Sequence, residues 1–258
     1  MRIALGVAYE GTYYHGWQLQ ENLTTVQGCL EQAISKVADC SVNVICAGRT
    51  DRGVHAVAQV VHFDTHAERD MRSWVLGTNT HLPPDIRVHW AQQVSDEFHA
   101  RFSATTRAYR YIIFNRAIRS AILHSHTSWH IYPLDEKRMQ AAAQYLVGEH
   151  DFSSFRANEC QAKSPVRTIH YLTVKRVNDF VIVDIKANAF LHHMVRNITG
   201  VLLAIGEGKQ EPIWVQEVLE AKNRTQAGIT APAAGLYLTE VNYPGLFKIP
   251  NTSEVLLL

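Results

Sequence analysis

The sequence predicts an α+β fold of two ferredoxin-like halves that share a mixed, mostly antiparallel sheet, with an active-site cleft between the halves. Segments with the 3.6-residue period of an amphipathic helix alternate with short apolar, β-branched segments. In each half these segments follow the order β-α-β-β-α-β, which is the ferredoxin-like order. The expected halves are residues 1–103 and 104–258. Since no Pro- or Gly-rich linker separates them, we expect them to be closely joined.

In the first half we expect two helices between four strands. The predicted helices are 25–38 and 69–77, and the predicted strands are 3–9, 42–47, 56–63 and 86–94. The helix at 25–38 has the clearest pattern, because its apolar residues recur at steps of three and four and Thr25 can cap its N-terminus.

The second half is expected to repeat this plan with one additional helix. Its predicted strands are 105–114, 167–176, 180–187 and 236–243, and its predicted helices are 135–147, 190–206 and 212–221. Asp135 can cap the first of these helices, and Pro212 suits the first turn of the last. The helix at 190–206 is expected to bury one apolar face and to turn the other outward, with His192, His193, Arg196, Thr199 and Gly200 on it.

Composition favours a soluble, cytoplasmic protein that contacts no membrane. Hydrophobic residues make up 47% of the chain and charged residues 19%, as in ordinary globular proteins. The chain opens on a strand-like segment without a charged-then-apolar leader, and no apolar run is long enough to span a bilayer. The four cysteines show no C-x-x-C spacing, so we expect reduced, buried thiols and neither disulfides nor zinc.

Charge is unevenly distributed, although the net charge is only +1. No acidic residue occurs from residue 98 to 134 or from 185 to 206, whereas both stretches contain arginines and histidines. This segregation is expected if one face of the protein meets phosphate groups. A basic face that contacts only solvent is the alternative.

A polar turn at residues 48–56 carries one carboxylate between two strand-forming segments. It reads Gly-Arg-Thr-Asp-Arg-Gly-Val-His-Ala and places Asp51 at its crown. Arg49 and Arg52 would favour the ionised carboxylate, which a nucleophile or general base requires. Asp and Gly are also the ordinary residues of turns, so the segment alone would more often be a purely structural turn.

The sequence predicts neither a metal ion nor a bound cofactor. The neighbouring His192 and His193 would point about 100° apart on a helix, and no H-E-x-x-H motif accompanies them. The other close histidine pairs lack a matching ligand set, and neither G-x-G-x-x-G nor a P-loop is present.

Several segments together resemble the tRNA pseudouridine synthase A family. Residues 48–56 match the family signature G-R-T-D-x-G-V-H-A, with Arg52 at its variable position. Further similar blocks occur in the family's order at residues 14–20, 25–27, 98–104, 190–197 and 235–238. The resemblance therefore extends along the whole chain.

The resemblance implies a cofactor-independent isomerase that converts uridine to pseudouridine at positions 38 to 40 of the tRNA anticodon stem-loop, and it implies a homodimer. It assigns Asp51 as the carboxylate at the ribose, Tyr109 as the residue that stacks on the base, and Arg196 as the partner of the carboxylate. We further predict substrate contacts for five residues, namely Arg49, Thr50, His55, Arg107 and Arg110.

Two functions from other classes are the alternatives. Ferredoxin-like sheets also bind RNA without catalysis, but the presence of Asp51, Tyr109 and Arg196 in one chain argues against a passive module. A metal-dependent hydrolase built on the 14 histidines is the second alternative, and full activity in the presence of a chelator would exclude it.

The acid-free stretch at 98–134 leads to a prediction about salt dependence. If this stretch follows the RNA, log affinity should fall linearly with log salt, with a slope set by the number of neutralised phosphates. Replacing Arg116 and Arg119 together with Gln should flatten that slope, by roughly 0.7 to 0.9 for each phosphate contact that is lost. Filter binding between low and moderate salt measures the slope, and an unchanged slope would place both arginines on a plain solvated surface.

Overall fold

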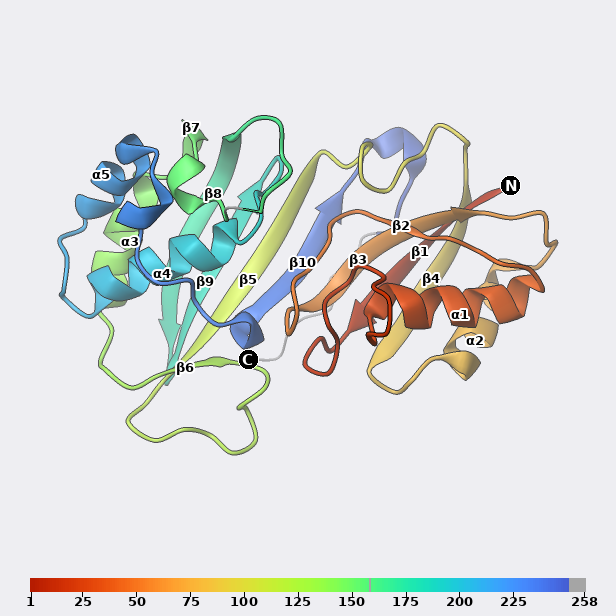
Figure 1. The fold of residues 1–258 in the computed structure, drawn as a ribbon, viewed down its shortest axis with the longest axis horizontal. Helices are drawn as coiled ribbons and strands as arrows, with labels where there is room; N and C mark the ends of the chain where they lie inside the picture. The colour runs from red at the N-terminus through yellow and green to blue at the C-terminus, as the bar shows by residue number, and fades with distance from the viewer. Residues whose placement is uncertain (158, 251–258) are drawn as a thin grey trace. The chain divides into compact units, whose positions relative to one another are not determined.

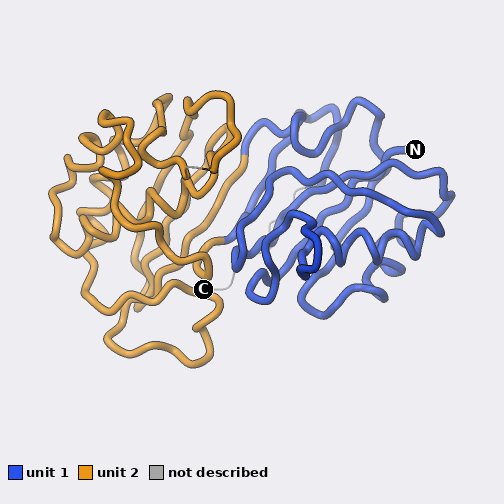
Figure 2. The backbone as a smooth tube through the Cα atoms, in the orientation of Figure 1, with its two compact units in different colours: residues 1–106, 237–258 blue, residues 107–236 orange. Residues whose placement is uncertain are grey.

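The computed structural model describes residues 1–157 and 159–250, which form two compact units (Figure 2). One unit comprises residues 1–106 and the described part of 237–258, and the other comprises residues 107–236. The described residues contain ten β-strands and five α-helices, and their strands are mostly antiparallel. The α+β class expected from the sequence is therefore confirmed.

Unit 1 is a sheet covered by two helices. Its longest strands are β4 (Ile86–Val94), at the edge of the sheet, β1 (Arg2–Tyr9) and β3 (His55–Asp64), which pair antiparallel in that order. The short strand β2 (Ile45–Cys46) is antiparallel to β3, and β10 (Leu236–Asn242) runs parallel to β3. The helices α1 (Val26–Ala38) and α2 (Met71–His81) pack against each other on one face of the sheet (Figure 1).

Side chains of α1 explain why β2 is shorter than the strand expected at 42–47. The Ser35 hydroxyl accepts a hydrogen bond from the Val42 amide, and the Glu31 carboxylate accepts one from the Val44 amide at 2.9 Å. These amides are thereby satisfied without a strand partner, so the ladder contains only Ile45 and Cys46. The helix itself begins as expected, with Thr25 Oγ1 accepting from the Gly28 amide.

Unit 2 contains an antiparallel sheet and three helices. The strands β5 (Thr106–Asn115), β9 (Phe180–Ala187), β8 (Val166–Val177) and β7 (Gly148–Asp151) are neighbours in that order. A short strand, β6 (Ser128–His130), lies parallel to β5. The helices are α3 (Glu136–Gln144), α4 (Met194–Gly206) and α5 (Trp214–Ala221) (Figure 1). The sequence pattern did not reveal β6 and β7, each of which has at most four residues.

The helix α4 differs from its prediction in its start and in its outer face. It begins at Met194, not at 190, because His193 has a left-handed φ of 60° that a helix does not tolerate. The face expected to point outward is buried at Thr199 and Gly200. A Cβ on Gly200 would lie 1.7 Å from the Ile229 carbonyl oxygen, so the chain at Ile229 covers this face.

The strand β10 lies near the end of the chain but pairs with a strand of unit 1. We expected 236–243 to belong to the half formed by residues 104–258, but Tyr237 and Leu238 pair with His55 and Ala56 of β3 in unit 1. Residues 251–258 of that expected half lie outside the described residues. Long-range pairing of this kind is not visible in local periodicity.

The cysteines differ in burial from what was expected. All four were expected to be buried, but only Cys46 is, while Cys29 and Cys160 are partly exposed and Cys40 is exposed. Burial raises the pKa of the Cys46 thiol to about 12. Among the residues that the structure describes, none of the helices is both long enough and apolar enough to cross a bilayer.

A buried histidine joins β3 to the segment that follows β4. His62 is only 2% exposed, and its Nδ1 accepts a hydrogen bond of 3.1 Å from the Ala100 amide. Burial, together with the nearby charges of Arg2 and His99, lowers the pKa of His62 to about 4. The neutral ring is therefore part of the folded structure.

Acid should destabilise the fold through His62. Its pKa is lower in the folded state than the ordinary 6.5, so the contribution is complete above pH 6.5 and is lost as the pH falls toward 4. The loss should amount to about 3 kcal/mol of unfolding free energy. His62→Asn keeps an acceptor for the Ala100 amide but does not titrate, so urea unfolding at pH 7.5 and 4.5 should show a smaller loss in the variant. An equal loss in both proteins would contradict this role.

Candidate active site

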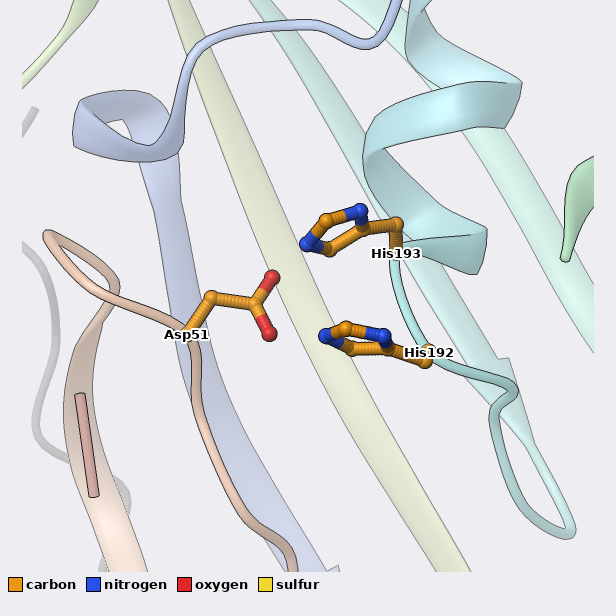
Figure 3. Close-up of side chains that lie close together, drawn as sticks. All are labelled: Asp51, His192 and His193. Atoms are coloured by element: carbon orange, nitrogen blue, oxygen red, sulfur yellow. The ribbon is translucent and has the colours of Figure 1, made fainter. Parts of the chain in front are cut away.

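The turn that carries Asp51 connects β2 to β3 and contains a hydrogen bond between its own backbone groups. The Val54 amide donates to the Asp51 carbonyl oxygen at 3.1 Å, and Gly53 supplies the positive φ of 77° that the turn requires. Figure 3 shows the Asp51 side chain projecting from this loop. Asp51 is partly exposed, while Arg49 and Arg52 on either side of it are exposed. The tight turn predicted at this position is present.

Buried polar contacts hold the residues next to Asp51. The Thr50 hydroxyl lies 2.7 Å from the Tyr9 hydroxyl of β1, and the Thr50 carbonyl oxygen accepts from the Trp17 amide. Gln59 of β3 donates its side-chain amide to the Gly48 carbonyl oxygen at 2.7 Å. Thr50, expected to contact the substrate, is 7% exposed and thus anchors the turn.

The loop after β1 packs against the other side of the turn. A Cβ on Gly11 would lie 2.0 Å from the Val54 carbonyl oxygen, so the two backbones are in direct contact there. The Gly11 amide also donates to His55 Nδ1, and the His55 ring stacks on Tyr237 at 4.6 Å. His55, for which a substrate contact was predicted, is 2% exposed and forms these contacts within unit 1.

In unit 2, strand β5 separates its predicted site residues onto two faces. Arg107 and Tyr109 are two positions apart and share one face, whereas Arg110 lies on the other. Tyr109 is 9% exposed, and its ring packs edge-on against Phe190 at 5.0 Å. The Arg107 guanidinium donates to the Asn188 carbonyl oxygen.

Arg110 has a partner that the sequence did not reveal. Its guanidinium binds both carboxylate oxygens of Asp184, directly opposite on β9, at 2.7 and 3.1 Å. This bidentate bond raises the pKa of Arg110. Arg110, for which a substrate contact was predicted, therefore also stabilises the pairing of β5 with β9.

The start of α4 brings two histidines and an arginine into a short segment. Because His192 and His193 precede the helix, they do not point 100° apart as expected, and their rings lie 4.0 Å apart (Figure 3). Arg196 lies in the first turn of α4, where its Nε donates to the Ala231 carbonyl oxygen at 2.8 Å. The orientation of the Arg196 side chain thus depends on the segment that covers α4.

Arg116 and Arg119, which were predicted to contact phosphates, both have neighbours within unit 2. The Arg119 guanidinium lies 4.9 Å from the centre of the Trp129 ring. Arg116 lies 3.5 Å from a carboxylate oxygen of Asp179, and both groups are more than half exposed. Such an exposed pair is weak, so the charge of Arg116 stays available to a phosphate.

A rigid turn that presents one aspartate, in an α+β fold, is typical of an enzyme that uses a fixed carboxylate. The profile of one family, described as tRNA pseudouridine synthase, matches residues 6–103 and 142–244. A protein from Coxiella burnetii (strain Dugway 5J108-111), "tRNA pseudouridine synthase A", is 59% identical over 97% of this chain and 96% of its own length. Proteins of the same description from Vibrio vulnificus (strain YJ016) and Nitrosococcus oceani are 58% and 57% identical over 98% of this chain.

The chain belongs to the tRNA pseudouridine synthase family. The resemblance derived from its motifs is therefore confirmed, and the chain is an isomerase that converts uridine to pseudouridine in tRNA. Its reaction is an intramolecular rearrangement. The site must consequently hold the uracil while its bond to the ribose is exchanged.

The contact between Gly11 and Val54 should be essential for activity. Gly11→Ala introduces a methyl group 2.0 Å from the Val54 carbonyl oxygen, so the Asp51 turn must shift by about 1 Å or more. A displacement of this size lowers rates roughly 100-fold when a reacting group is misplaced. Single-turnover formation of pseudouridine measures the effect. Gly245→Ala is the matched control, since nothing lies within 4 Å of its added Cβ. Equal rates for both variants would show that the turn does not depend on this contact.

Proposed function

We propose that this protein converts uridine to pseudouridine at positions 38, 39 and 40 of the anticodon stem-loop, and that it acts in the cytoplasm as a homodimer without a cofactor. The observation that carries the proposal is the Asp51 turn. Its nine residues match the family signature, and its backbone is fixed by Tyr9, Trp17 and Gln59. The shared name of the relatives, "tRNA pseudouridine synthase A", supports the same substrate class.

The chemistry requires few protein groups because the reaction is balanced within the substrate. The bond from N1 to ribose C1′ breaks, the uracil turns, and a bond from C5 to C1′ forms. The proton on C5 is removed and N1 acquires one, so no electrons and no transferred group are needed. A carboxylate, an aromatic platform and a base for the C5 proton are sufficient for this sequence of steps.

Asp51 is the carboxylate at the ribose in this proposal. It either attacks C1′ as the nucleophile or removes a ribose proton as the base. In either role, a carboxylate oxygen of Asp51 must be held close to the ribose atom with which it reacts. Anchoring through Thr50 and Gly48 limits the motion of the backbone that carries it. Such positioning of a reacting group contributes several kcal/mol to catalysis, on the order of 7 or more in favourable cases.

Tyr109 is the proposed platform for the detached uracil and the acceptor of the C5 proton. Its ring is held edge-on by Phe190, so its orientation is fixed before the substrate arrives. Arg196 is proposed as the partner that keeps the Asp51 carboxylate ionised, a role in which the planar guanidinium is better suited than lysine. Arg49, exposed beside Asp51, is proposed to hold the target nucleotide out of its stack.

Removing the carboxylate should separate catalysis from binding. Asp51→Asn and Asp51→Ala should reduce pseudouridine formation to below a few thousandths of wild type, because no other group at the turn can replace the carboxylate. Affinity for unmodified tRNA should persist, since phosphate contacts elsewhere supply most of it. Chemical labelling and primer extension would map the product, with wild-type stops expected at positions 38 to 40.

The same experiment distinguishes the alternatives. Turnover in either Asp51 variant close to wild type would remove Asp51 from its role. Tight binding without product in the wild-type protein would indicate a passive RNA-binding module. Loss of wild-type activity in a chelator would instead favour a metal-dependent reaction.

A further inference from the structure

The segment between β4 and β5 displays a phenylalanine to solvent in a fixed position. Phe102 is 76% exposed, yet its ring stacks on His99 with 4.4 Å between ring centres and 30° between planes. The Arg101 guanidinium lies 5.5 Å from the centre of the same ring. An exposed ring that its neighbours hold in place offers a flat apolar surface on which a planar group can stack.

Hydrogen bonds and core packing hold this segment in place. His99 Nδ1 accepts from the amides of both Arg101 and Phe102 at 3.2 Å, which orients the imidazole beneath the phenyl ring. The amide of Ala100 donates to His62, and its carbonyl oxygen accepts from the Tyr243 hydroxyl. Phe102 therefore does not need to be ordered when a partner binds, which lowers the entropy lost on binding.

The segment that carries Phe102 is basic in its sequence. Residues 98 to 134 contain no carboxylate. The positive charges of Arg49 and Arg101 both act on the Cys46 thiol, opposing the rise in its pKa that burial causes. Both guanidinium groups consequently lie near β2, the strand that leads into the turn.

The Phe102 segment is anchored on β3 at a point away from the turn. His62, which binds this segment, is seven residues from His55 at the end of the turn, or roughly 23 Å along a strand. Stacked nucleotides rise about 3.4 Å each, so this length of strand corresponds to roughly seven nucleotides.

We infer that Phe102 and Arg101 form a second RNA-binding site, in which an unpaired base several nucleotides from the target stacks on the Phe102 ring while Arg101 binds a neighbouring phosphate. An aromatic ring beside a guanidinium is the usual means by which proteins grip unpaired bases without reading their sequence. This inference rests on the proposed function, because it takes tRNA as the ligand. It adds a remote contact that fixes how the RNA lies relative to Asp51.

Equilibrium binding of unmodified tRNA at constant salt tests the stacking. Phe102→Ala and Phe102→Leu should both bind roughly tenfold or more weakly, whereas Phe102→Trp should retain affinity because it retains the aromatic face. Arg101→Gln should reduce the slope of log affinity against log salt by about 0.7 to 0.9. Leu246→Ala is the matched control, since Leu246 is a 69% exposed apolar residue in the same unit and should bind like wild type.

Photo-cross-linking identifies the partner of the ring. Phe102→p-benzoylphenylalanine should give an adduct with tRNA at an unpaired nucleotide outside positions 38 to 40. The inference would be overturned if the cross-link instead joined two protein chains, and if Phe102→Ala had a lower sedimentation mass but unchanged affinity for tRNA. These results would assign the ring to a subunit contact. Wild-type affinity of Phe102→Ala alongside normal product formation by wild type would also overturn it. Absence of product from wild type would instead contradict the proposed function.

Discussion

The contact between the loop after β1 and the Asp51 turn is the constraint on which the rest of the site depends. At Gly11 the two backbones approach so closely that no side chain fits between them, and the Trp17 amide bonds to the Thr50 carbonyl oxygen. Tyr9 reaches the same threonine from β1. Strand β1 and the loop after it thus determine the conformation of one turn, which allows an aspartate to be partly exposed and still held in a defined position.

The pleat of β5 distributes roles among residues that the sequence presents as one basic cluster. Alternation places Tyr109 and Arg107 on one face, and Arg110 on the face where it meets Asp184 of β9. The salt bridge is partly buried and bidentate, so its contribution exceeds that of an ordinary surface pair. Arg110 therefore supports the strand pairing that holds Tyr109, while Arg107 lies on the face of Tyr109.

Local patterns in the sequence predicted the elements whose stabilisation is local. The bounds of β4 and β9 agree with their predictions, and Thr25 and Asp135 cap α1 and α3 as expected. Two predicted elements differ at their ends. Strand β2 is shorter than predicted because the Val44 amide bonds to the Glu31 side chain of α1, and α4 starts later than predicted because His193 has a left-handed conformation. The Asp51 turn was visible in the sequence because its residues are contiguous. Its anchors, Tyr9 and Gln59, were not visible, because only the fold brings them together.

The two aromatic residues given RNA-binding roles differ in how their environment supports them. Tyr109 is nearly buried and packs against Phe190, so a base placed on it would lose most of its water and stay close to the groups that act on it. Phe102 is exposed and supported on one side only by His99, an arrangement that offers area for stacking but no enclosure. A nearly buried ring such as that of Tyr109 can exclude water from a reacting base. An exposed ring such as that of Phe102 can stack with any base. The open platform therefore explains how an enzyme could hold tRNAs of different sequence with the same orientation.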